Sequence, residues 1–313
     1  MIKTRAIVLH RFPYSDSSWI VKALTEETGT VSFIVKGGKR KDSPFRGALD
    51  PLALCEIVYR ENPNTELQFL KEASVINWHP HLREDLLALA KAQVMAEIVL
   101  RYAPAGVPLE GEFSLLEETL AALDVPDIKL SADDNSEVKL PADSEVKPPE
   151  AGYSPEVKPP ADSEVKQPAG YSPKQDAAPS LPAGIKPPAG IKQPANKSGV
   201  FARWLLDICE LWGYHLDMSS CSRCDHQIEG APADFHPETG AFVCKSCLGV
   251  ETPRARPETL AGFEALRTGR AIAHPEYVEN ALLAYLRSHI GFMREINSLK
   301  FLNETRKLYD RSR

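Results

Sequence analysis

Four cysteines form the most specific chemical pattern in this sequence. They fall in two C-x-x-C pairs, Cys221 with Cys224 and Cys244 with Cys247, and nineteen residues separate the pairs. Two thiolates from each pair can approach one ion, and this spacing is typical of four-cysteine zinc sites. Such a site leaves no coordination position for water. We therefore expect one structural Zn²⁺ that stabilises a ribbon over residues 221–247 and takes no part in catalysis.

Two alternatives to this zinc site stay open at the level of sequence. The four thiols could be buried or reducible without a metal ion, or His226 or His236 could replace one cysteine as a ligand. Cys55 and Cys209 fall within apolar runs, and we interpret them as small core residues and not as nucleophiles.

A second chemical feature is a basic segment at residues 36–46 that contains Gly37 and Gly38. Five cations and one acidic residue in eleven positions suit a phosphate backbone, although an exposed basic loop is more often only solvated. The five cations are Lys36, Lys39, Arg40, Lys41 and Arg46. Further cations that could extend a DNA track are Lys3, Arg5, Arg11 and Lys22. Phe12, Tyr14, Trp19 and Phe45 could stack on bases, although we favour their interpretation as core residues.

Signatures of enzymatic chemistry are absent from the sequence. It contains no Walker loop, G-x-S-x-G or H-E-x-x-H motif and no paired-carboxylate signature. The remaining histidines are scattered, and we interpret them as structural. We therefore expect a protein that is not an enzyme.

Composition restricts the class of protein. The 313 residues include 37 Lys and Arg against 43 Asp and Glu, so the net charge of −6 gives no global sign of a nucleic-acid binder. The basic excess is confined to residues 1–50, which carry nine basic and five acidic side chains. No apolar run reaches the roughly 18 residues of a membrane span, and the first residues lead into an alternating pattern. We expect a soluble chain that is not exported.

Periodicity divides the chain into two kinds of structure. Five short β-branched or aromatic runs separated by turn signals predict a small closed barrel within residues 1–80. From residue 81 the apolar period becomes helical. The predicted strands cover residues 6–9, 19–24, 31–35, 53–59 and 67–71. The predicted helices cover residues 82–102, 112–123, 201–212, 257–268, 276–288 and 290–309.

Residues 126–198 interrupt the helical part. They hold fourteen of the 26 prolines and repeat short units such as Ser-Glu-Val-Lys, so we expect a disordered insert without a packed core. Such a segment is most simply a tolerated expansion of a surface loop, because lengthening an open loop costs little entropy. A Pro-rich docking tether is the alternative.

Taken in order, several stretches resemble the bacterial RecO family of recombination mediators over residues 1–123 and 199–313. The N-terminal stretches are Thr4 to Leu9 followed by Tyr14 to Ser18, and Val35 to Ser43 continuing into Arg46 to Pro51. The C-terminal stretches are Leu205 to Tyr214 leading into the first cysteine pair, then Tyr285 to Ile290 and Asn297 to Lys300. The insert departs from the family pattern, so nothing is carried onto it.

The resemblance implies an α+β protein: an N-terminal five-stranded OB-fold barrel over residues 1–80, followed by an α-helical domain in two parts, 81–125 and 199–313, that holds the four-cysteine ribbon. It also implies a non-enzymatic, cytoplasmic and nucleoid-associated role: binding single- and double-stranded DNA, annealing complementary strands, and acting with RecR to replace single-strand-binding protein by RecA. RecF is a further candidate partner. The family docks the acidic tail of single-strand-binding protein on its helical domain. No motif places that tail here, and Arg203, Arg267 and Arg294 are candidates by charge only.

Two other classes of function stay open. One is a zinc-ribbon protein that binds RNA or a promoter, and a preference for RNA over single-stranded DNA of equal length would indicate it. The other is a hydrolase stabilised by zinc, and a turnover assay on variants of the scattered histidines would reveal it. Neither accounts for the barrel, the basic segment and the ribbon together.

Overall fold

The computed structural model describes residues 1–45, 47–104, 106–126, 197, 199–290 and 296–311. The predicted insert 126–198 therefore lies outside the described residues except for Pro126 and Lys197. Arg46 and Arg294, named above as candidate site residues, also lie outside.

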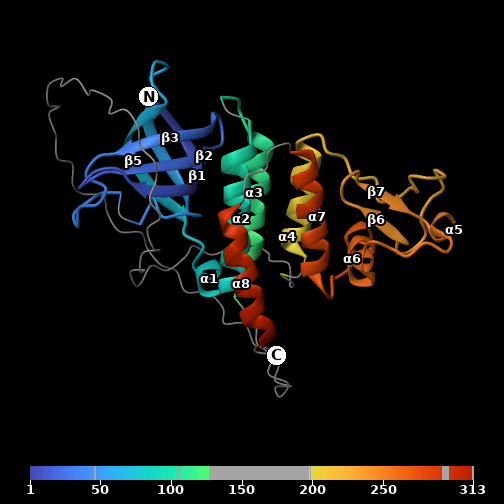
Figure 1. The fold of residues 1–313 in the computed structure, drawn as a ribbon. Helices are drawn as coiled ribbons and strands as arrows, with labels where there is room; N and C mark the ends of the chain where they lie inside the picture. Colours follow the sequence, from blue (N-terminus) through green and yellow to red (C-terminus); the bar gives the residue numbers. More distant parts are fainter. Residues whose placement is uncertain (46, 105, 127–196, 198, 291–295, 312–313) are drawn as a thin grey trace, which may run out of the picture. The chain divides into compact units, whose positions relative to one another are not determined.

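The N-terminal part is a closed five-stranded barrel (Figure 1). Its strands are β1 (Ile2–Pro13), β2 (Trp19–Thr25), β3 (Gly29–Val35), β4 (Leu54–Arg60) and β5 (Leu67–Asn77). Their order around the barrel is β1-β2-β3-β5-β4, and β4 closes it by pairing with β1. Every pairing is antiparallel except that of β3 with β5. This confirms the predicted barrel, and its five strands and small size are those of an OB-like fold.

Two strands are longer than their apolar runs. The predictions 6–9 and 67–71 mark only the apolar centres of β1 and β5, which extend to residues 2–13 and 67–77. The additional residues are partly exposed, yet they remain in register with β2 and β4. Backbone pairing continues beyond the buried segment because ladder hydrogen bonds do not require an apolar side chain.

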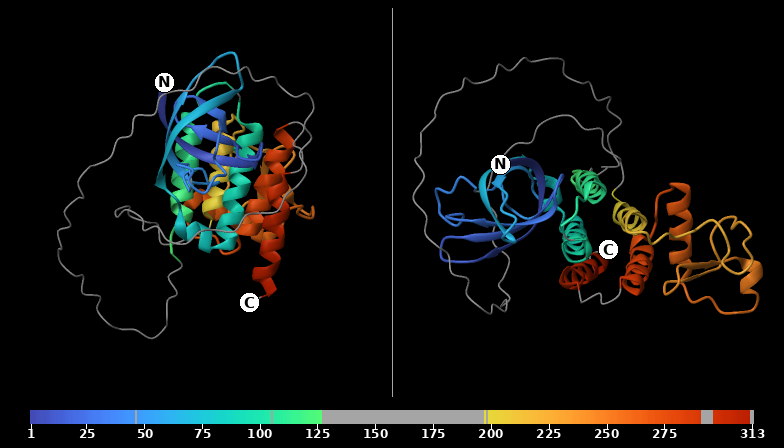
Figure 2. Two further views of the ribbon diagram at one scale, coloured as in Figure 1. Left: turned by 90° about the vertical axis from the view of Figure 1, so that its left-hand side faces the viewer. Right: turned by 90° about the horizontal axis from the view of Figure 1, so that it is seen from above.

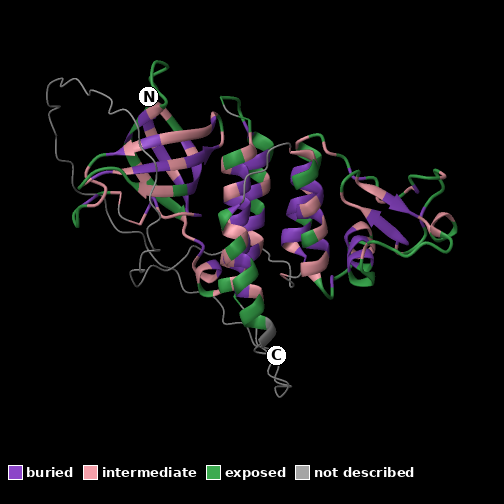
Figure 3. Ribbon diagram, in the orientation of Figure 1, coloured by how far each residue is buried: buried purple, intermediate pink, exposed green. Residues whose placement is uncertain are grey.

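Successive residues of β1 belong to different cores: Ala6 and Val8 lie in the barrel interior, and Ile7 and Leu9 in the core shared with the helices, so all four are buried. Figure 3 shows the buried segments of the barrel strands. The interior is apolar and includes the edge-to-face pair of Phe33 and Tyr59, whose ring centroids lie 5.1 Å apart. Cys55 points into this interior, where burial raises the pKa of its thiol to about 12. It is a core residue, as the sequence predicts.

Helices form the rest of the described chain. They are α1 (Pro80–Glu84), α2 (Leu86–Tyr102), α3 (Glu110–Leu123), α4 (Val200–Leu211), α5 (Lys245–Leu248), α6 (Pro257–Thr268), α7 (Pro275–His289) and α8 (Asn297–Arg311). α2 packs against α3 and α8, α3 against α4, and α4 and α6 against α7. The right-hand view of Figure 2 looks along several of these helices. Within the described ranges, no helix has both the length and the apolar character needed to cross a bilayer.

Two predicted helix boundaries are wrong. The single helix expected over 82–102 is divided at Asp85, which adopts an extended backbone and accepts hydrogen bonds from the N–H groups of Leu87 and Ala88. Asp85 is thus the N-cap of a new helix, α2, which begins at Leu86. The last helix begins at Asn297 and not at residue 290, because Ile290 is the C-cap of α7 and Glu97 of α2 accepts the N–H groups of Asn297 and Ser298.

The barrel and the helices share one apolar core. Ile7, Leu9 and Leu24 of the barrel belong to the same buried cluster as Phe113 and Leu116 of α3. At the β2–β3 turn, a Cβ on Gly29 would lie 2.1 Å from the carbonyl oxygen of Val107, so only glycine permits this close approach. The barrel is therefore held against the helices by tight packing.

The described residues on either side of the insert meet at one place. Asp124, after α3, accepts a hydrogen bond from the N–H of Leu82 at 2.8 Å. Lys197, before α4, forms an ion pair with Asp85 at 3.0 Å. Both anchors therefore lie at the junction of α1 and α2.

Candidate functional site

The two cysteine pairs converge on one point. β6 (Asp234–His236) and β7 (Ala241–Val243) form a short antiparallel hairpin between them. Cys244 follows β7 directly and precedes α5, while Cys221 and Cys224 lie in a turn whose Ser222 N–H donates to the Phe242 carbonyl oxygen at 2.9 Å. All four Sγ atoms lie within 4.8 Å of one another. The set can hold one metal ion.

The two alternative histidine ligands are engaged elsewhere. His226 Nδ1 lies 3.0 Å from the carbonyl oxygen of Cys224, and His236 Nε2 lies 3.1 Å from a carboxylate oxygen of Asp234. The metal-ligand cluster found among the described residues consists of the four cysteines without either histidine.

The electrostatics of the cluster favour at least one thiolate. Burial raises the pKa of Cys221, but backbone N–H groups from Cys244, Arg223 and Cys224 point at its sulfur and lower the pKa to about 6 overall. The thiol of Cys247, hydrogen-bonded to Cys224 and Cys244, has its pKa raised to about 12. Because the thiolate is the metal-binding form, a bound dication would have to displace the proton of Cys247.

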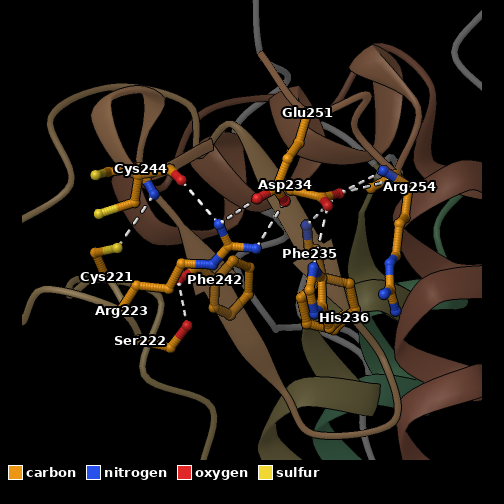
Figure 4. Close-up of polar contacts among 12 residues, drawn as sticks. Cys221, Ser222, Arg223, Asp234, Phe235, His236, Phe242, Cys244, Glu251 and Arg254 are labelled. Carbon is orange, nitrogen blue, oxygen red and sulfur yellow. Dashed lines mark hydrogen bonds and ion pairs between the residues drawn. The ribbon is translucent and has the colours of Figure 1, made fainter. Parts of the chain in front are cut away.

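Polar contacts of two side chains, Asp234 and Arg223, hold the ribbon together (Figure 4). The buried carboxylate of Asp234 accepts the N–H groups of Phe235, Arg254 and Ala255 at 2.8–2.9 Å, which ties the hairpin to the segment before α6. Arg223, between the first two cysteines, binds Glu251 and also the carbonyl oxygen of Cys247 at 2.8 Å. The turn that holds Cys221 and Cys224 is thereby linked to the one that holds Cys244 and Cys247, independently of any ion.

The basic segment, residues 36–46, is the connection that leaves β3. Lys36, Arg40 and Lys41 are exposed there. Gly37 has a positive φ of 71°, and its carbonyl oxygen accepts the N–H of Arg40 at 3.0 Å, so the segment turns tightly after the strand. The structure therefore brings several cations together on one exposed turn.

Lys39 and Arg11 of β1 are held by contacts with neighbouring residues. Lys39 donates to the carbonyl oxygen of Ser15 and lies 5.1 Å above the Trp19 ring. Arg11 covers the same ring at 4.7 Å and pairs with Asp50 at 2.6 Å. Lys39, Arg11 and Trp19 therefore form one packed cluster.

Arg5 joins the barrel to the helices. Its guanidinium binds Glu26 at 2.5 Å and Glu117 of α3 at 2.6 Å, and the hydrogen bonds that it donates to Glu26 raise its pKa. It also lies 5.2 Å from the centre of the Phe113 ring. Two carboxylates compensate this charge, so Arg5 contributes less to a positive surface than its position in the sequence indicates.

The aromatic residues divide into packed and exposed ones. Phe45 packs against the barrel core, and Phe12 is half-buried, whereas Tyr14 is 45% exposed. The sequence analysis did not include Phe69 of β5, which is 46% exposed with the ammonium of Lys36 5.1 Å from its ring centre. In the sequence, Leu67, Phe69 and Leu70 are apolar and Gln68 is polar, so no alternation in this run indicates that Phe69 points outward.

The comparisons with known proteins agree with this architecture. Residues 1–79 match the family described as "Recombination protein O N terminal". Matching curated proteins are named DNA repair protein RecO. The protein of Geobacter metallireducens is 38% identical over 124 residues, which cover 39% of this chain and 49% of the relative. That of Salinibacter ruber is 29% identical over 131 residues, covering 42% and 50%. That of Anaeromyxobacter dehalogenans (strain 2CP-C) is 25% identical over 316 positions, covering 97% and 96%. The chain thus spans about half the length of the first two and nearly all of the third.

Proposed function

We propose that this protein acts in DNA repair as a DNA-binding recombination mediator, because residues 1–79 match the RecO N-terminal family model and a DNA repair protein RecO aligns with 97% of the chain at 25% identity. It binds single- and double-stranded DNA in the cytoplasm, at the nucleoid, and it is not an enzyme. Barrel 1–80 is the main DNA-binding domain, and residues 81–125 and 199–313 form the helical domain on either side of insert 126–198.

The observation that carries this proposal is the exposed basic turn on an OB-like barrel. Lys36, Arg40 and Lys41 project from one turn after β3, and Lys36 lies over an exposed aromatic ring. Fixed cations beside aromatic surface are what a protein needs to hold a nucleic-acid strand without reading its sequence. Lys39, Arg46, Arg5 and Arg11 complete the proposed DNA-binding set, with Arg5 and Arg11 in supporting roles because carboxylates already bind them.

Annealing follows from the same charges. Two complementary strands repel each other, and a mediator without ATP chemistry lowers this repulsion by placing cations between their phosphates. The protein acts with RecR in replacing single-strand-binding protein by RecA, and RecF is a further partner. The homology to RecO supports these roles.

The helical domain offers a place for the acidic, Phe-terminated tail of single-strand-binding protein. A pocket of about 430 Å³ lies among α3, α4 and α6, with Arg203 and Arg270 beside apolar Leu115, Val200 and Ile272. Glu118 and Asp207 also line the pocket, and it is the two arginines beside apolar residues that would hold a terminal carboxylate next to a phenyl ring. Both Arg203 and Arg267 donate to backbone carbonyl oxygens, of Leu266 and Gly230, but only Arg203 lines this pocket and stays a candidate.

The metal of the cysteine cluster is one Zn²⁺ in a structural role. Four thiolates in a compact set favour zinc over hard cations, and a four-sulfur set leaves no open position for a reacting water. The ligands are Cys221, Cys224, Cys244 and Cys247. Zinc would join the two C-x-x-C pairs and stabilise the ribbon that follows α4.

The test of DNA binding reverses two exposed charges. The variant R40E/K41E, which leaves the packed Lys39 in place, should bind a 30-nucleotide single strand at least about tenfold more weakly at moderate salt. Its salt slope should fall by about 1.4, since each lost single-strand phosphate contact contributes about 0.7. Annealing of complementary strands should decline in parallel. Fluorescence anisotropy across a salt series and a strand-annealing assay measure both.

A matched control separates the loop from total charge. K245E/K307E changes the net charge equally at exposed lysines in the ribbon and in α8, and its DNA affinity should stay close to that of the parent. If both variants bind and anneal like the parent, the basic turn is only a solvated loop. An RNA strand of equal length, bound more tightly than DNA, would instead indicate the zinc-ribbon RNA-binding alternative.

A further inference from the structure

One row of residues crosses four neighbouring strands on the barrel and ends on a fifth. The registers pair Phe12 of β1 with Ile20 of β2, Ile20 with Ile34 of β3, Ile34 with Phe69 of β5, and Phe69 with Arg60 of β4. Residues directly opposite in a ladder project from the same face of the sheet. We call these five residues the outer strip.

Burial shows that the outer strip faces away from the barrel interior. The residues next to its members in sequence, Val21, Phe33 and Leu70, belong to the interior core. Because side chains alternate along a strand, the members of the strip point outward. Phe69 is 46% exposed, and Ile20, at 7%, is the one well-covered member.

The first four residues of the outer strip are apolar, and cations border the strip and end it. Lys36 lies two positions beyond Ile34 and holds its ammonium 5.1 Å from the Phe69 ring centre. Lys22 lies two positions beyond Ile20, on the same face, opposite His10 and Ser32. Arg60 ends the strip and is exposed. Positive charge therefore lies on both sides of an aromatic and aliphatic row.

The other large aromatic residue of this region is in a different position. Trp19 lies on the same side of β2 as the interior residues Val21 and Ala23 and packs against the barrel core. Arg11 and Lys39 lie over its ring. Both cations occupy ring surface that a base would need. Trp19 therefore packs on the core under two cations, whereas Phe69 carries the single cation Lys36 and is 46% exposed.

We propose that the outer strip is the surface on which bases of single-stranded DNA stack, with Phe69 as the main stacking residue and Lys36, Lys22 and Arg60 beside the phosphates. This rests on the proposed function. Every base has a π face, so such a strip binds bases without sequence preference, and flanking cations hold the backbone. Phe12 and Phe69 are three strands apart, roughly 14 Å along the surface, which is enough for separate bases to occupy the two ends.

The test separates bases from phosphates. Full-length parent and Phe69→Ala are titrated with a labelled oligothymidine and with an abasic oligonucleotide of equal length, which keeps the phosphates and lacks the bases. Phe69→Ala should lose at least about fivefold in affinity for oligothymidine and little for the abasic strand, with an unchanged salt slope. Phe69→Trp should restore binding, and its added indole fluorescence should be quenched by oligothymidine.

The control is Val75→Ala, which removes exposed apolar surface from the same strand outside the strip and should bind both strands like the parent. Thermal unfolding of each variant checks that the barrel is intact. Equal losses for both oligonucleotides in Phe69→Ala would overturn stacking, because they would show that Phe69 acts through Lys36. Parental binding of both strands by Phe69→Ala would also overturn it and leave the strip to a protein partner. If the parent binds neither strand, the proposed function itself fails.

Discussion

Replacing Glu279 by Gln should destabilise the helical domain more than any surface change. Glu279 of α7 is fully buried and accepts a hydrogen bond from Lys91 of α2 at 2.7 Å. Its second oxygen binds Arg306 of α8. Lys91 is itself only 9% exposed at the side chain. One carboxylate therefore compensates two cations brought together from three helices.

The expected loss follows from what the substitution leaves behind. An amide has nearly the same size, so packing is kept, but the buried ammonium of Lys91 and the guanidinium of Arg306 then face each other without a counter-charge. Breaking a buried pair in this way costs about 3–5 kcal/mol. At about 2–4 °C per kcal/mol for a domain of this size, Tm should fall by roughly 6–20 °C.

Circular dichroism melts of E279Q, K91M and the double variant measure this effect. Removing the stranded cation should recover at least about 1 kcal/mol, so E279Q/K91M should be more stable than E279Q alone. Glu56→Gln is the control, because its pair with Lys3 is exposed and should be worth at most about 1 kcal/mol. A Tm for E279Q within about 3 °C of the parent, or no recovery in the double variant, would refute the reasoning.

Three further predictions concern the metal, the pH and the insert. Protein purified without chelator should contain about one zinc equivalent by elemental analysis, and C221S/C247S should lose both the metal and solubility; less than about half an equivalent in the parent would count against the site. Burial raises the pKa of Glu97, but hydrogen bonds from Ser298 and Asn297 outweigh it and leave the pKa lowered. The stabilising contribution of Glu97 is therefore fully present above the unfolded-state pKa near 4.3 and disappears as the pH falls through the folded-state pKa. E97Q should have a lower Tm than the parent at pH 7, and its Tm should fall less between pH 5 and 3. An identical dependence of Tm on pH in the two proteins would contradict this. Replacing residues 130–195 by a short Gly/Ser linker should leave Tm and DNA affinity nearly unchanged, because the flanking anchors meet at the α1–α2 junction; a selective loss of partner binding would instead support the tether.

The features that the sequence determined by itself are those carried by local spacing. The cysteine pairs predict a four-sulfur cluster because each C-x-x-C turn brings its own two thiols together, and the structure places all four within reach of one ion. The five strands likewise follow from short apolar runs between turn residues, and the barrel confirms them. Helix boundaries were less accurate, since the cap at Asp85 interrupts an apolar stripe that is otherwise continuous.

Only the tertiary structure decided which charged and aromatic side chains are available. Arg5 meets Glu117 from 112 positions away, and Lys91 meets Glu279 from 188 positions away. No local pattern reports such partners, because the energy of a charge depends on its neighbours in space and on its burial. The same holds for the choice between Trp19 and Phe69: both are aromatic residues on strands, and strand register together with barrel closure turned one toward the packed interior and the other toward solvent.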